Sequence, residues 1–168
     1  MASSKSKEKT KPSHLPERNS LSPAELTLGT EFVRSIAPQA GLDSTLDSIA
    51  RLASRISGGD GCLIHLLDRK RNLLEAAGRY RVGEEFAEPV KPGQGIPGTA
   101  FRQRKPVSVS DLQKAPSAGW REASQKQRFG SAISLPLRGR RRTLGTITFF
   151  RRGSRPLGGA GLPLLRAL

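Results

Sequence analysis

The chain has 168 residues, of which 35% are hydrophobic and 5% aromatic, enough for one domain with a core if its polar ends are left out. Its 29 Lys and Arg outnumber 14 Asp and Glu, and the formal net charge of +15 favours anionic partners such as nucleic acid, an acidic membrane face or a phosphorylated ligand. Cys62 is the single cysteine and no segment approaches the ~20 apolar residues of a membrane helix, so an internal disulfide, a cysteine zinc site and a transmembrane segment are excluded, and a cytoplasmic location is expected.

The first forty residues divide into two parts. Residues 1–20 are Lys, Ser, Glu and Pro with almost nothing to bury, which predicts a disordered basic tail and not a signal peptide. In residues 21–40, Ser22 and Pro23 form a helix start, and the apolar residues that follow recur every four positions until Pro38. We therefore expect a short N-terminal helix and linker that packs on the main domain or on a second copy.

A second helix is predicted from about Ser44 to Ser57. Asp43 or Ser44 can cap its start, and the pair Gly58-Gly59 can end it, because glycine accepts a left-handed backbone at little cost. Six apolar residues fall on one face at helical spacing: Leu42, Leu46, Ile49, Ala50, Ala53 and Ile56.

Two β-hairpins are predicted on either side of a glycine-containing middle. In the first, the mostly apolar run 62–68 indicates a strand with both faces covered, and the polar turn 69–72 leads to a return strand over 73–77. In the second, the Arg-rich turn 138–142 joins strands over 131–137 and 143–150. The middle is expected to contain a loop over 79–95 with a short strand near 88–90, a helix over 95–102, a strand over 106–111 and a short helix around Trp120. Hairpins joined by helices indicate an α+β domain with a mainly antiparallel sheet.

Four segments resemble GAF domains and follow the order found in that family. They are a strand ending in Leu-Leu-Asp (60–68), a Gly-x-Gly-Ile-x-Gly loop followed by a helix, Lys-Pro and a strand (90–112), a strand ending in a Pro-hydrophobic pair (128–137), and a Gly-containing final strand (143–152). A lone glycine loop is weak evidence, but four segments in register make the chain from about Leu42 to Leu168 similar to a GAF domain.

The resemblance implies a six-stranded, mainly antiparallel sheet in residues 41–168, with terminal helices on one face and a small-molecule pocket between the other face and mobile loops. It also implies a sensory function. A bound small molecule would change the packing of the terminal helices, across a homodimer, and so signal to a partner protein or output domain. In the family the last helix usually continues well past the position of Leu162. Here the sequence stops within a few residues of Leu162, so a truncated C-terminal helix is expected. The sequence identifies neither the ligand nor a cofactor.

Seven residues are candidates for the pocket: Leu63, His65, Arg79, Tyr80, Gly95, Ile96 and Trp120. Strand alternation puts Leu63 and His65 on one face, which the resemblance directs at the pocket. The alternative for His65 is a core imidazole satisfied by a backbone carbonyl. Arg79 and Tyr80, after the second strand, suit a planar or anionic ligand, and otherwise belong to a solvated surface.

Gly95 and Ile96 belong to a loop whose glycines can either present amides to an anion or only shape the turn: Gly93, Gly95 and Gly98. Trp120 is either a lid over the ligand or an anchor of its loop to the core. Cys62 is expected to be a buried structural thiol, because the family members that reduce methionine sulfoxide need a second thiol to resolve a sulfenic acid.

The last hairpin carries a cluster of arginines with no acid between them: Arg138, Arg140, Arg141, Arg142, Arg151 and Arg152, with Arg155. On a hairpin tip they would form one positive patch, and the chain would alternatively be a basic interaction module for nucleic acid or an acidic protein. A solvated turn is the simpler interpretation. Few aromatic residues accompany the patch for base stacking, so nucleic acid is not the favoured partner. No Ser–His–acid set and no pair of carboxylates on a rigid frame points to an enzyme.

Overall fold

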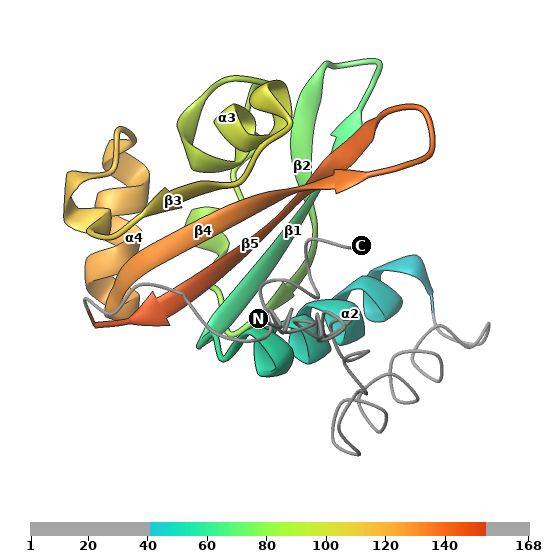
Figure 1. Cartoon of the computed structure of the whole chain (residues 1–168). Coiled ribbons are helices and arrows are strands. Elements are labelled where there is room, and N and C mark those ends of the chain that lie inside the picture. Colours follow the sequence, from blue (N-terminus) through green and yellow to red (C-terminus); the bar gives the residue numbers. More distant parts are fainter. Residues whose placement is uncertain (1–40, 154–168) are drawn as a thin grey trace, which may run out of the picture.

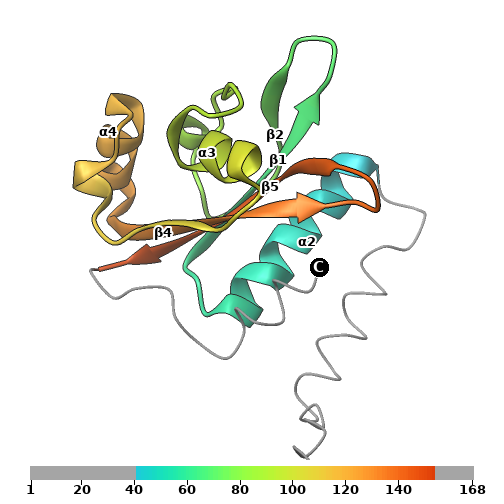
Figure 2. The ribbon, with the colours of Figure 1, turned by 45° about the horizontal axis from the view of Figure 1, so that its top comes forward.

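The computed structural model describes residues 41–153. In these residues a twisted antiparallel sheet has one long helix on one face and two shorter helices on the other (Figure 1, and Figure 2 from a second angle). The predictions for residues 1–20 and 21–40, for the C-terminal helix and for Arg155 lie outside the described residues. None of the helices between residues 41 and 153 is long and apolar enough to span a bilayer.

The sheet has five strands in the order β2-β1-β5-β4-β3, and every neighbouring pair is antiparallel. The strands are β1 (Gly61–Asp68), β2 (Leu73–Tyr80), β3 (Val107–Val109), β4 (Phe129–Arg138) and β5 (Thr143–Arg152). Both predicted hairpins are confirmed. β1 and β5 join the two hairpins at the centre of the sheet, where Ile64 lies opposite Ile147.

The resemblance predicted a six-stranded sheet, whereas the described residues form five strands. The segment near 88–90 makes only an isolated bridge, in which Val90 and Leu74 exchange backbone hydrogen bonds of 2.8 and 2.9 Å. Pro89 and Pro92 flank this bridge and have no N–H to donate, so a strand ladder cannot extend from it. The strand predicted over 106–111 is likewise reduced to the three residues of β3, which begins after Pro106.

The helices in the described residues lie close to their predicted positions. They are α2 (Leu42–Ser57), α3 (Gly95–Gln103) and α4 (Ala118–Gln127), with short 3-10 turns η1 (Glu84–Phe86) and η2 (Leu112–Lys114). α2 begins earlier than expected because its N-cap is Gly41, so the prediction that Asp43 or Ser44 caps the helix is wrong. Gly58 ends α2 with a left-handed φ of 65°, as predicted.

α2 covers one face of the sheet through an apolar interface. The small helix residues Ala50 and Ala53 meet larger strand side chains: Cys62, Ile64, Ile133, Leu135, Ile147 and Phe149. The helix lies directly on the backbone of β2, because a Cβ added to Gly78 would be 2.6 Å from the carbonyl carbon of Leu46. A side chain at position 78 would therefore displace α2 from the sheet.

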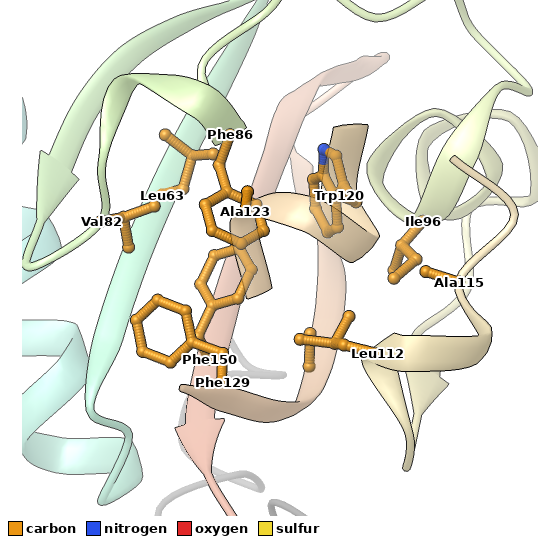
Figure 3. Close-up of a cluster of buried hydrophobic side chains, with 11 residues drawn as sticks. Leu63, Val82, Phe86, Ile96, Leu112, Ala115, Trp120, Ala123, Phe129 and Phe150 are labelled. Carbon is orange, nitrogen blue, oxygen red and sulfur yellow. The ribbon is translucent and has the colours of Figure 1, made fainter. Parts of the chain in front are cut away.

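The opposite face is divided into two parts. One part is an aromatic and aliphatic cluster that includes Leu63, Phe86, Trp120, Phe129 and Phe150 (Figure 3). The other part lies towards α3, which packs on β4 and β5. It contains four fully buried polar side chains from three strands: His65, Ser134, Thr146 and Thr148.

Candidate functional site

A hollow of about 340 Å³ lies at the aromatic part of this face. It forms where the loop before α3, the first turn of α3 and the first turn of α4 meet. Its lining combines apolar and polar groups: Glu88, Pro89, Val90, Gln94, Gly95, Pro97, Pro116, Ser117 and Trp120. The volume lies within the range of small-molecule sites.

Trp120 forms one wall of the hollow and is fixed from two directions. Its backbone amide donates a 3.4 Å hydrogen bond to the hydroxyl of Ser117, which caps α4. Its indole packs edge-on against Phe86, with ring centroids 5.2 Å apart, and lies 5.5 Å from the ring of Phe150. The indole nitrogen faces away from Phe129 and Phe150 (Figure 3). Trp120 is thus an anchor of α4, and its contact with a ligand remains a prediction.

The loop before α3 forms the neighbouring wall, and its glycines are explained by backbone geometry. Gly93 and Gly95 have left-handed φ values of 91° and 57°. A Cβ on Gly98 would lie only 2.3 Å from the carbonyl oxygen of Lys91. Gly95 lines the hollow, and its contact with a ligand stays a prediction, whereas Ile96 is buried in the aromatic cluster behind this wall.

Leu63 and His65 lie on the predicted face but contribute to the core and not to the lining of the hollow. His65 is fully buried opposite Thr146. Within the described residues, the two imidazole nitrogens of His65 and the hydroxyl of Thr146 have no hydrogen-bond partner. The alternative in which a backbone carbonyl satisfies His65 is therefore wrong. Burial lowers the pKa of His65 to about 4, and the imidazole is neutral at pH 7.

Tyr80 is not at the hollow, and this prediction is wrong. Its half-buried side chain packs with the apolar cluster under α2. The reason is a bulge in β2, where Ala76 pairs with His65 and Gly78 with Ile64, which leaves Ala77 without an opposite residue. An extra residue reverses the alternation of the strand beyond it, so Tyr80 turns towards α2.

Arg79 lies in a different hollow, a groove of about 560 Å³ at the edge of β2 next to α2. The backbone amide of Arg79 donates to the carboxylate of Asp47 at 2.7 Å, and its guanidinium pairs with Glu84 at 2.8 Å. This hydrogen bond and the charge of Arg79 lower the pKa of Glu84. Arg79 is therefore already paired and does not line the hollow beside Trp120, although Glu88 lines both hollows.

Cys62 is fully buried on the α2 face, on the other side of the sheet from the hollow. Burial without a compensating charge raises the pKa of its thiol, so the reactive thiolate is disfavoured. Among residues 41–153, no group of three His, Cys, Asp or Glu side chains is arranged to hold a metal ion.

The predicted arginine patch is divided by the structure. Four of its members, Arg138 and residues 140–142, are exposed at the turn between β4 and β5. Arg151 and Arg152 lie at the other end of β5, about 30 Å away along an extended strand. There the amide of Arg152 donates to the carboxylate of Asp60 at 2.8 Å. The prediction that all six arginines form one patch is therefore wrong.

Several residues of the hollow were missed by sequence reasoning. Pro89, Val90 and Pro116 line it from two loops that are far apart in the chain, and Phe86 and Phe150 support Trp120 from below. The sequence signal for these loops was a proline in each turn. A proline indicates a bend in the backbone, but it does not indicate which residues the bend will contact.

The sequence profile of the GAF domain family matches residues 39–168, and the chain belongs to this family. Its fold is similar to that of the GAF domain from an Acinetobacter phosphoenolpyruvate-protein phosphotransferase (TM-score 0.67, 18% identity, covering 88% of this chain and 89% of that one). It is also similar to the GAF domain from the phosphoenolpyruvate-protein phosphotransferase of Coxiella burnetii (TM-score 0.70, 12% identity, 84% and 86% covered). The Nif-specific regulatory protein of Herbaspirillum seropedicae is 34% identical over 83 residues, which cover 48% of this chain but only 14% of that protein.

Proposed function

We propose that this chain is a regulatory GAF domain that binds a small molecule in the hollow beside Trp120 and transmits the binding without catalysing a reaction. The observation that supports this most directly is the hollow itself, with its volume of about 340 Å³ and with Trp120 in its wall. A regulatory function also agrees with the similarity to the Nif-specific regulatory protein, although the match covers a small part of that protein.

The lining favours a ligand with a flat apolar body and a hydrogen-bonding edge. Pro89 and Pro116 are exposed at the hollow and offer flat apolar surfaces beside Trp120, and the exposed side chains of Glu88 and Gln94 lie at the same hollow. Aromatic and proline walls bind a planar body, while a small number of polar groups fixes its orientation.

Strand β1 connects the ligand face to α2. Leu63 belongs to the aromatic cluster behind Trp120, while the adjacent residues Cys62 and Ile64 belong to the interface with α2. A ligand that moves the cluster would move the strand on which α2 lies. It can do so only if it binds the two arrangements with different affinities. We propose that a second copy of the chain or a partner protein responds to the resulting shift of α2.

The proposal that the domain is not an enzyme rests on the position of its reactive side chains. Cys62 lies on the opposite face with a raised pKa, and His65 is enclosed and neutral. Neither lines the hollow, where Glu88 is the titratable side chain. Among the described residues that line the hollow, no hydroxyl is hydrogen-bonded to a base, which is the arrangement that nucleophilic catalysis requires.

Fluorescence of Trp120 tests the proposal, because it is the single tryptophan of the chain and forms a wall of the hollow. Native mass spectrometry of the purified protein would identify a retained molecule and the oligomer mass, and titration with that molecule should change the emission saturably. The Gln94→Phe variant, which places a ring in the hollow, should weaken binding by at least about tenfold. Gln103→Phe, an exposed position at the other end of α3, is the matched control. Equal effects of the two variants would place the ligand elsewhere.

A further inference from the structure

Three segments that are distant in sequence meet at one end of the sheet. β1 and β5 are antiparallel neighbours, with Leu66 opposite Gly145, so the turn after β1 and the turn before β5 lie side by side. Both turns extend from the same side of the sheet (Figure 1). The guanidinium of Arg138 donates a 2.7 Å hydrogen bond to the carbonyl of Arg104, which joins the second turn to the end of α3.

This end of the molecule, which we call the basic end, carries ten basic side chains, and all of them are exposed. Three lie in residues 69–71, three in residues 102–105 and four in residues 138–142. Two acidic residues lie among them: Asp68 accepts hydrogen bonds from the backbone of the first turn, and Glu75 pairs with Arg71. The net charge here is +8, whereas the other described residues, with eleven basic and eight acidic side chains, carry only +3. The positive charge is therefore concentrated at one end.

The side chains of the basic end suit phosphate better than a protein surface. Eight of the ten are arginines, whose planar guanidinium binds phosphate through two parallel hydrogen bonds. Protein interfaces have an apolar core. Among the side chains that the structure describes, Leu144 is the exposed large hydrophobic one, and a single leucine with 44% of its surface exposed cannot supply such a core.

The dimensions of the basic end suit a duplex. The two turns join the four adjacent strands β2, β1, β5 and β4, which are about 14 Å across, wider than the ~12 Å major groove of B-form DNA, so the end can contact phosphates of both strands. No aromatic side chain in the described residues is exposed, so none is available to stack on an unpaired base. We propose that the basic end binds the phosphate backbone of duplex nucleic acid without reading its sequence. This surface is separate from the hollow beside Trp120.

Binding of the full chain to fluorescein-labelled DNA duplexes tests the proposal by fluorescence anisotropy at increasing salt. Two duplexes of unrelated sequence should bind equally well. Each phosphate contact adds about 0.9 to the slope of the logarithm of the binding constant against the logarithm of salt concentration. The triple variant R140Q/R141Q/R142Q should therefore reduce that slope by nearly 3 and weaken binding at least about tenfold at ~100 mM salt.

A matched variant separates the basic end from overall charge. R51Q/K126Q/R128Q removes the same number of charges from exposed residues of α2, α4 and the C-cap of α4, and it should weaken binding by less than about threefold. R69Q/K70Q, in the other hairpin, removes two charges and should reduce the slope by nearly 2, because the surface is composite. Circular dichroism and thermal unfolding should be unchanged in all three variants, since every substituted side chain is exposed.

Three results would overturn the proposal. Equal losses in R140Q/R141Q/R142Q and R51Q/K126Q/R128Q would show that binding depends on net charge alone. Tighter binding to a polyglutamate peptide or to phosphatidylserine vesicles than to the duplex, at equal salt, would assign the surface to an acidic protein or a membrane. An undiminished affinity of R69Q/K70Q would show that the two turns do not act together.

Discussion

The face of the sheet under α2 buries Ile64, Ile147 and Phe149, whereas the opposite face of the same strands buries His65 and Thr146. Adjacent residues of β1 and β5 alternate between the two faces, so the same backbone supports two different interiors. An apolar interior requires only that its shapes fit, while a buried polar group also requires a hydrogen-bond partner. The α2 face is thus structural. The other face contains buried polar groups that packing alone does not explain.

The largest effect should come from the centre of the apolar face. Phe149 is fully buried there, and Phe149→Ala leaves a cavity that should lower the free energy of unfolding by about 4 kcal/mol. Urea denaturation measures this loss. Leu144→Ala, on the same strand but with a side chain 44% exposed, should change stability by less than about 0.5 kcal/mol. Similar losses in the two variants would contradict the structural function of this face.

On the opposite face, a large loss in the free energy of unfolding should appear only at low pH, where His65 becomes protonated. Burial lowers the pKa of His65 to about 4 from its usual 6.5, so between these values the unfolded chain binds a proton that the folded chain does not. The stability that depends on a neutral His65 is fully present above pH 6.5 and should decrease by about 3 kcal/mol as the pH falls to about 4.

Urea denaturation at a series of pH values measures this decrease. The His65→Leu variant keeps His14 and every carboxyl group, so the difference between its pH profile and that of the original chain isolates His65. Parallel profiles would show that the imidazole is not enclosed as described.

The smallest effects should have opposite signs at two neighbouring threonines. The hydroxyl of Thr148 donates to Ser134 at 3.0 Å, whereas within the described residues the hydroxyl of Thr146 has no partner. Thr148→Val should therefore lower the free energy of unfolding by about 1 kcal/mol, while Thr146→Val should raise it by a similar amount. Thermal unfolding of the two variants gives the comparison directly. A loss at both positions would mean that Thr146 has a bound partner in solution.

Much of the fold was predictable because its signals are local. The periodic apolar residues of α2 and the apolar runs of β1 and β5 need no knowledge of their neighbours. The errors in the strands came from proline: Pro89 and Pro106 interrupt hydrogen-bond ladders that the apolar residues around them would otherwise favour. The family resemblance supplied the arrangement of helices and pocket on the two faces of the sheet, which local patterns could not.

The site was less predictable because it depends on residues that meet only in the folded chain. The bulge at Ala77 determines where Tyr80 points, and it is set by pairing across the sheet. Arg79 forms an ion pair with Glu84, which lies in a segment whose sequence has no periodic apolar pattern. The basic end depends on the neighbouring positions of β1 and β5, and the sequence indicated only one of its three segments.

Both edges of the sheet are poor templates for another strand. At one edge β3 is three residues long and follows Pro106, and at the other the backbone groups of Leu74 are occupied by Val90. Open sheet edges recruit strands from other molecules and so start aggregation. The domain can therefore be crowded with copies of itself with little risk of fibre growth through these edges.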